Sequence, residues 1–131
     1  MNKFSFLSFV LVSLVSGVAF GYDMERAVTN YAHELAECGA FFEIGSSIPN
    51  IEEDTKKQSD KNALYVINLS GQMTSKKLAL ARLEMAEKDM MRELDGRWEN
   101  FSILLNKYLD LCQQFVEKPD IRFQYWLDKK D

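Results

Sequence analysis

The stretch Trp98–Val116, WENFSILLNKYLDLCQQFV, carries the most regular apolar pattern in the chain. Its large apolar residues recur at spacings of three and four, which is the period of one helix face. This stripe consists of Trp98, Phe101, Leu105, Tyr108, Cys112 and Phe115. Lys118-Pro119 ends the pattern, because the residue before a proline is disfavoured in helical geometry. We therefore predict a long helix that begins near Trp98 and has Cys112 on its buried face.

A second helix with the same periodicity is predicted upstream. Asp23 is a suitable N-cap residue, and the apolar stripe that follows it ends near Gly45. The polar segment 45–61 contains Pro49, so we predict a long connecting loop there.

Helical character resumes around Asp60 and continues to Leu94. Thr74-Ser75 is ambiguous, because it fits either a helix break with a capping hydroxyl or a weak point in one continuous helix. The C-terminal tail, residues 119–131, is short enough to form at most a small helix.

The composition limits the fold and the function classes. The chain has 131 residues with a net charge of −4, which is enough for one domain and argues against a nucleic-acid partner. No strand-like alternation is visible. We predict an all-α fold, a small bundle of three or four helices.

The N-terminus is typical of an export signal. Lys3 precedes the apolar run Phe4–Phe20, and Ala19 and Gly21 supply small residues for a cleavage site. We predict that residues 1–21 are a signal peptide and that residues 22–131 form a single helical domain in the periplasm or outside the cell. An uncleaved anchor is the alternative, because the run approaches the length of a membrane span. After cleavage we expect no stable membrane span.

Cys38 and Cys112 are the two cysteines of the chain. Export to an oxidising compartment favours a disulfide between them, worth about 4.5 kcal/mol in the chain-entropy model. An intermolecular disulfide and two free thiols are the alternatives. Both cysteines lie near the C-terminal ends of their predicted helices, so pairing would bring these ends together. That disfavours a simple up-down-up-down bundle. It leaves either three helices or four helices with segment 45–61 as a crossover.

Little in the chain suggests catalysis. His33 and Glu37 share a helix face, but a catalytic zinc site usually takes three protein ligands with more than one histidine, and His33 is the single histidine. We therefore predict no catalytic residues, no metal site and no cofactor. The protein is expected not to be an enzyme.

Several aromatic residues are candidates for partner binding. Phe41 and Phe42 are adjacent on a predicted helix, so we expect that both cannot face the same core. The tail offers Phe123, Tyr125 and Trp126, and Arg122 precedes Trp126 by four residues, a spacing suited to a cation–π contact. Aromatic residues and arginine dominate interface energetics. The alternative is that the tail packs back over the bundle.

Two groups of residues carry a resemblance. Glu37-Cys38-Gly39-Ala40-Phe41-Phe42 near the start, with Cys112, Pro119, Arg122, Tyr125 and Trp126 near the end, resembles the two ends of small secreted helical proteins of bacteria and their phages. Those proteins are uncharacterised. The resemblance supports the cysteine pairing and implies no catalytic residue.

These observations predict a non-enzymatic exported protein-interaction module, such as an inhibitor, an immunity-type protein or an envelope accessory protein. Its partner is expected to be another protein of the cell envelope, and a homodimer is possible. The alternative is a helical bundle that binds a lipid or another apolar molecule between its helices.

Overall fold

A computed structural model describes residues 10–130 of the chain, with side chains from Asp23 onward. Within this range the structure is all-α, as predicted, but it has five helices and one 3₁₀ turn rather than three or four helices. The elements are α1 (Val10–Ser46), α2 (Glu53–Met73), α3 (Lys76–Glu93), the 3₁₀ turn Trp98–Asn100, α4 (Ser102–Glu117) and α5 (Pro119–Asp128).

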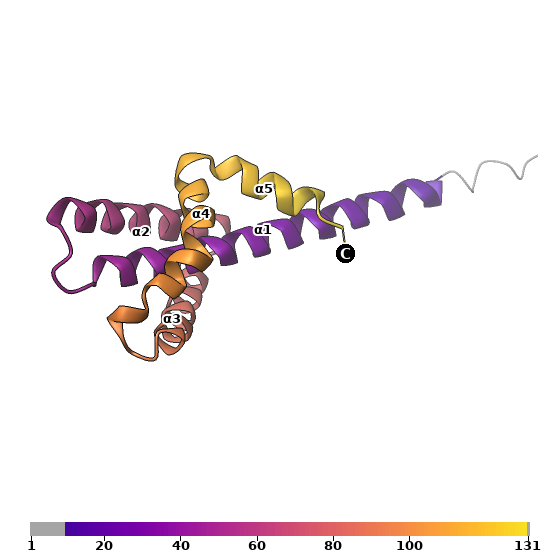
Figure 1. Cartoon of the computed structure of the whole chain (residues 1–131). Helices are drawn as coiled ribbons and strands as arrows, with labels where there is room; N and C mark the ends of the chain where they lie inside the picture. Colours follow the sequence, from indigo (N-terminus) through magenta and orange to yellow (C-terminus); the bar gives the residue numbers. More distant parts are fainter. Residues whose placement is uncertain (1–9, 131) are drawn as a thin grey trace, which may run out of the picture.

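Helix α1 is the centre of the fold. In Figure 1, α2 lies along its C-terminal half, α3 packs below it at an angle, α4 crosses it, and α5 runs back beside it. The face that α1 presents to its neighbours is rich in alanine, and Ala32, Ala36 and Ala40 have no exposed surface. Small side chains allow helix backbones to approach closely. The Ser70 hydroxyl of α2 accordingly donates a 2.7 Å hydrogen bond to the Ala32 carbonyl of α1.

Gly39 is a point of close packing between α1 and its neighbours α2 and α3. A Cβ atom at this position would lie 2.6 Å from Cγ1 of Ile67 and 3.3 Å from Cδ1 of Leu83. The first distance is shorter than real carbon contacts allow. The absence of a side chain at Gly39 is therefore what lets α2 and α3 both rest on α1.

The predicted loop over residues 45–61 is wrong, because α2 already begins at Glu53. The connection is a short turn around Pro49, in which Asn50 has a φ of 63°. The first turns of α2 are polar and exposed, so they lack the apolar stripe by which a helix is detected. Lys56 and Asp60 form one of the i, i+4 pairs that support such an exposed helix, at 2.9 Å.

A turn separates α2 from α3, so the alternative of one continuous helix over 60–95 is wrong. Ser75 has extended backbone geometry, and its side chain accepts a 3.1 Å hydrogen bond from the amide of Leu78. This is an N-cap, the role considered for Thr74 or Ser75 from the sequence. The four-helix arrangement with a 45–61 crossover is also wrong, because a tight turn joins α1 to α2.

Two other boundaries and one position of the buried stripe differ from the predicted ones. Asp23 lies inside α1 rather than at its start. Helix α4 begins at Ser102, after a 3₁₀ turn at Trp98–Asn100. Leu104, rather than Leu105, is the fully buried leucine of the α4 stripe, since Leu105 is 38% exposed. The helix stop before Pro119 is confirmed, and Pro119 then opens α5 at a first-turn position that suits proline.

The disulfide between Cys38 and Cys112 is present, with a Cα–Cα distance of 5.3 Å. Cys38 lies well inside α1 and not near its end, so the bond joins two crossing helices rather than two helix ends. Because α4 crosses α1 (Figure 1), the fold is not a simple up-down-up-down bundle.

Residues 1–9 of the predicted signal peptide lie outside the described residues. The remainder of that segment belongs to α1, which continues through the predicted cleavage point at Gly21. Among the described residues, no helix has a segment both long and apolar enough to cross a membrane. Cleavage of the signal stays a prediction.

Candidate functional site

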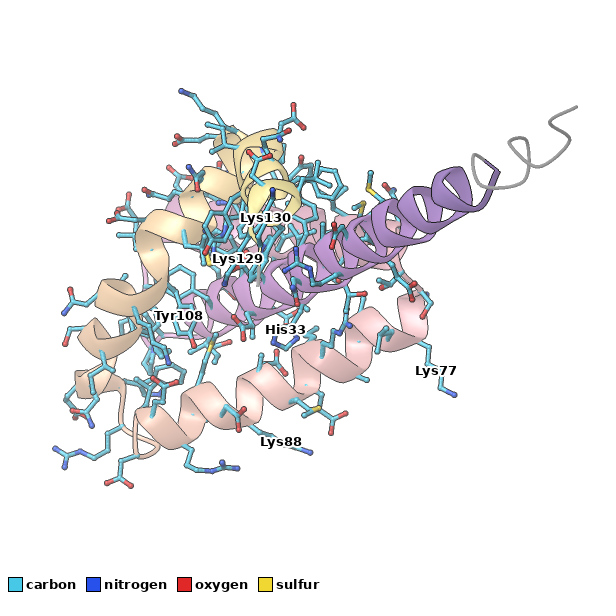
Figure 2. The ribbon with its side chains drawn as sticks, turned by 90° about the vertical axis from the view of Figure 1, so that its right-hand side faces the viewer. His33, Lys77, Lys88, Tyr108, Lys129 and Lys130 are labelled. Atoms are coloured by element: carbon cyan, nitrogen blue, oxygen red, sulfur yellow. A yellow bond between two sulfur atoms is a disulfide. The ribbon has the colours of Figure 1, made fainter. Side chains whose placement is uncertain are left out.

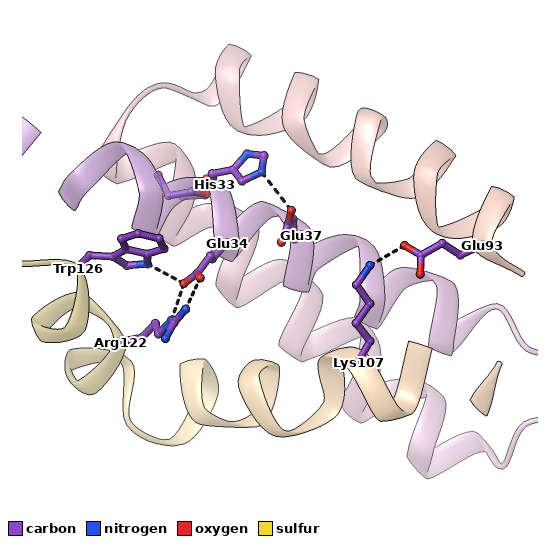
Figure 3. A network of polar contacts seen from close by, with 9 residues as sticks. His33, Glu34, Glu37, Glu93, Lys107, Arg122 and Trp126 are labelled. Carbon is purple, nitrogen blue, oxygen red and sulfur yellow. Dashed lines mark hydrogen bonds and ion pairs between the residues drawn. The ribbon is translucent and has the colours of Figure 1, made fainter. Parts of the chain in front are cut away.

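The carboxylate of Glu34 fixes α5 to α1 (Figure 3). Arg122 donates two hydrogen bonds to it, from Nε at 2.8 Å and from Nη2 at 2.6 Å, and Trp126 Nε1 donates a third at 2.9 Å. Glu34 is only 9% exposed, so its charge is satisfied by these donors instead of by water. The hydrogen bond with Glu34 raises the pKa of Arg122. We call Glu34, Arg122 and Trp126 the Glu34 network.

Further contacts hold the tail in place. The Tyr31 hydroxyl donates a 3.2 Å hydrogen bond to the Pro119 carbonyl, and the Phe123 ring packs edge-on against Tyr31 with 5.2 Å between the ring centres. The Arg122 guanidinium lies 5.4 Å from the Trp126 ring, which confirms the predicted cation–π contact.

Tyr125 takes part in a second cation–π contact, which the spacing does not predict. Its ring centre is only 3.9 Å from the Arg122 guanidinium. Contacts within the protein therefore occupy the side chains of Arg122, Phe123 and Trp126, and the tail packs back over the bundle. Tyr125 remains 43% exposed. Partner binding by these four residues stays a prediction.

Phe41 and Phe42 are both buried, with 4% and 5% of their surface exposed. The expectation that adjacent phenylalanines cannot both face the core is therefore wrong, because helices cover α1 on several sides. Their rings are 5.4 Å apart, and the Phe41 ring stacks on Phe101 of the α4 region at 6.1 Å. Neither side chain projects from the surface as a free anchor.

The two phenylalanines instead line a surface pocket of about 480 Å³ between the end of α1, the start of α2 and α4. We call it the aromatic pocket. Its apolar lining consists of Phe41, Phe42, Ile48, Ile51, Phe101, Leu105 and Leu109. Its polar lining consists of Asp54, Thr55, Gln58, Ser59, Asn62 and Gln113. An apolar pocket with a few polar groups at its rim is the usual form of a binding site for a small molecule or an anchoring side chain.

Sequence reasoning misses most of this pocket. Most of the polar wall belongs to the first turns of α2, where the pattern predicts a loop, and Gln113 of α4 adds to it. Ile48 and Ile51 flank Pro49 in an otherwise polar connection, and this pair is the signal that could have indicated a buried turn. Gly45 completes the site, because a Cβ there would touch both Phe101 and Ser59 at 3.5 Å.

His33 forms a 3.1 Å ion pair with Glu37, and this hydrogen bond raises its pKa. Its side chain is 55% exposed and lies between α1 and α3 (Figure 2). No group of three or more metal-ligating side chains occurs among the described residues. The pair is therefore an i, i+4 contact on a helix surface. The 2.9 Å ion pair between Lys107 and Glu93 differs from it, because it links α4 to α3 (Figure 3).

Comparisons of the chain with protein-family models, curated proteins and solved structures found no match.

Proposed function

We propose that the protein is a non-enzymatic exported interaction module. Its aromatic pocket would receive an apolar anchor side chain of a partner protein in the cell envelope. The observation that carries this proposal is the pocket itself, with a phenylalanine floor, a polar rim and an opening to solvent. Hot spots at protein interfaces are apolar or aromatic anchors that fill such pockets.

The surroundings of the pocket support this role. Cys38 precedes Phe41 on α1, and its disulfide ties that helix to α4, which carries Leu105 and Leu109. A covalent link between two walls limits their relative motion, and a pre-organised pocket loses less entropy when it binds. A disulfide is also consistent with an exported protein.

A photo-crosslinking experiment tests the proposal. A photoreactive amino acid at Gln58, on the pocket rim, is incorporated into the exported protein in its native cell, and the crosslinked species are identified. We expect one dominant protein adduct. Leu105→Asp should abolish it, because a charge would enter the apolar wall. Leu78→Asp is the matched control, since Leu78 is 40% exposed and Leu105 is 38% exposed, but Leu78 lies outside the pocket.

An adduct that survives in the Leu105→Asp variant, or the absence of any adduct, would contradict the use of this pocket. An adduct with a second copy of the chain would identify the homodimer as the relevant complex. Analytical ultracentrifugation of the same variants then shows whether the dimer depends on Leu105.

Binding of a lipid or another apolar molecule is the second candidate. The volume of about 480 Å³ favours it, because small-molecule pockets measure about 300–1,000 Å³. Native mass spectrometry of protein purified from its own host should then show a bound mass that Leu105→Asp removes. An empty spectrum together with a protein adduct would leave the interaction module as the function.

A further inference from the structure

A second groove runs between α2 and α3, away from the aromatic pocket. It has a volume of about 610 Å³, and its apolar walls are Leu64, Ile67, Leu80 and Leu83. Leu64 is 63% exposed and Leu80 is 45% exposed, so both leucines form the lips of the groove. Because α1 packs against both helices, Glu43 of α1 lies at its base. We call it the α2–α3 groove.

The α2–α3 groove is a consequence of the fold and not a packing defect. Ile67 and Leu83 approach each other over Gly39, where the missing side chain lets both helices rest on α1. From there the two helices extend on different sides of α1 (Figure 1). Leu64 and Leu80 are then left without a neighbouring helix to cover them.

Glu43 of the groove lining contacts a second carboxyl group, Glu87 of α3, which lies next to the groove and is not itself part of its lining. Burial and the side-chain hydrogen bond with Glu43 raise the pKa of Glu87 to about 7, and the charge of Glu84 adds to the shift. Among the ion pairs of the described residues, none includes Glu43 or Glu87. Lys76 also lines the groove, but it lies beside Gly71 at the turn into α3.

We propose that the α2–α3 groove binds an amphipathic helix of a partner protein that places a lysine or arginine on the Glu43–Glu87 pair. Two helices with exposed leucines on their lips form the type of groove that receives the apolar face of a third helix.

The carboxyl pair determines the charge of the occupant. An apolar residue over Glu43 and Glu87 would remove water from two acidic groups and offer nothing in return. A guanidinium or ammonium group would neutralise the repulsion between them and would supply hydrogen-bond donors for both carboxylates. Complementary charge of this kind gives an interface its specificity and register.

A display library tests this proposal with peptides of defined chemistry in place of the natural partner. Helical peptides of one scaffold, with one face randomised, are selected against the disulfide-bonded protein. Binders that also bind the Leu64→Ser/Leu80→Ser variant are removed. Both leucines are substantially exposed, so this variant should fold, and circular dichroism checks that it does.

We expect the remaining binders to carry an apolar stripe and lysine or arginine at one fixed position beside it. Exchange of that residue for glutamine should weaken binding at least tenfold. The Glu43→Gln/Glu87→Gln variant should remove this tenfold difference, and the Glu52→Gln/Glu99→Gln control should retain it, because both control residues are exposed and lie outside the groove.

Three results would overturn the proposal. The selection could yield no peptide whose binding depends on Leu64 and Leu80, or it could yield groove-binding peptides in which no basic residue is enriched. The tenfold loss of affinity on exchange of the basic residue for glutamine could also persist in the Glu43→Gln/Glu87→Gln variant. The outcome is separable from the function proposed above. The Leu105→Asp substitution affects only the aromatic pocket, so these peptides should bind that variant with unchanged affinity.

Discussion

Replacement of Glu34 by methionine should destabilise the protein by about 3 kcal/mol. The carboxylate accepts three hydrogen bonds, at 2.8, 2.6 and 2.9 Å, and it joins helices that are far apart in the sequence. The substitution leaves the Arg122 guanidinium without its counter-ion beside a helix surface. Removal of one partner of a buried ion pair costs about 3–5 kcal/mol. The side chain of Arg122 is 23% exposed, which places our value at the lower end.

The partner substitution and the double variant sharpen this prediction. Arg122→Met should cost about 2 kcal/mol, because Trp126 still donates to the carboxylate that remains. The double variant Glu34→Met/Arg122→Met leaves neither charge unpaired and should cost about 2 kcal/mol, well below the sum of the two single effects. The implied coupling energy is about 3 kcal/mol.

Urea unfolding in a Trp98→Phe background gives the measurement, because Trp126 is then the single tryptophan of the chain and reports the environment of α5. Amide hydrogen exchange over Pro119–Asp128 separates detachment of α5 from global unfolding. Lys107→Met is the control, since its ion pair with Glu93 also joins two helices but its side chain is 54% exposed. Its cost should stay below about 1 kcal/mol.

An effect of Glu34→Met within about 0.5 kcal/mol of the Lys107→Met control would refute the assignment of the Glu34 network as the main attachment of the tail. Strict additivity in the double variant would refute the direct coupling of the two charges.

Three further predictions concern other parts of the fold. Replacement of both Cys38 and Cys112 by serine should lower the free energy of unfolding by about 4 kcal/mol, measured by urea denaturation, and an unchanged midpoint would show that the bond contributes nothing. Gly39→Ala should destabilise the folded protein by about 1–3 kcal/mol because of the clash with Ile67, as measured by thermal unfolding. Gly71→Ala is the control, because its Cβ would lie 3.5 Å from the nearest atom, and it should be neutral or stabilising in the same measurement. The pKa of Glu87 is raised from 4.5 to about 7 in the folded protein, so the folded state binds the proton more tightly, and stability should fall as the pH rises from about 5 to 8. Glu87→Gln should remove most of this pH dependence of stability, and it should stabilise the protein at pH 8 by about 1 kcal/mol after allowance for solvent screening. A wild-type stability that rises with pH over this interval would contradict the prediction.

The sequence pattern was sufficient for those features that depend on local residues. The three-four spacing of Tyr108, Cys112 and Phe115 predicted a buried helix face, and all three side chains are buried. Pro119 predicted the end of that helix, since this effect acts over one turn of backbone. The hydroxyl residues at 74–75 offered a cap for α3 as one of two interpretations, and the structure shows which of the two is correct. The pairing of the two cysteines was also correct, because the chain offers no other partner for either sulfur.

The same reasoning failed where a residue's role depends on its distant neighbours. The first turns of α2 are polar, largely exposed and without an apolar stripe, so the pattern did not reveal that they are helical. The pair Phe41 and Phe42 was expected to split between core and surface, which is true of a helix covered on one side. α1 is surrounded by the other helices, and a helix in that position buries residues around most of its circumference.

The sequence by itself thus indicated the helical class, the helix end before Pro119 and the covalent link, because each follows from local backbone preference or from the count of sulfurs. Only the tertiary structure decided that α4 crosses α1, that Arg122 and Trp126 bind Glu34, and that the aromatic pocket and the α2–α3 groove are open to solvent. These features depend on which faces of α1 the other helices occupy, and no local pattern in the chain encodes that arrangement.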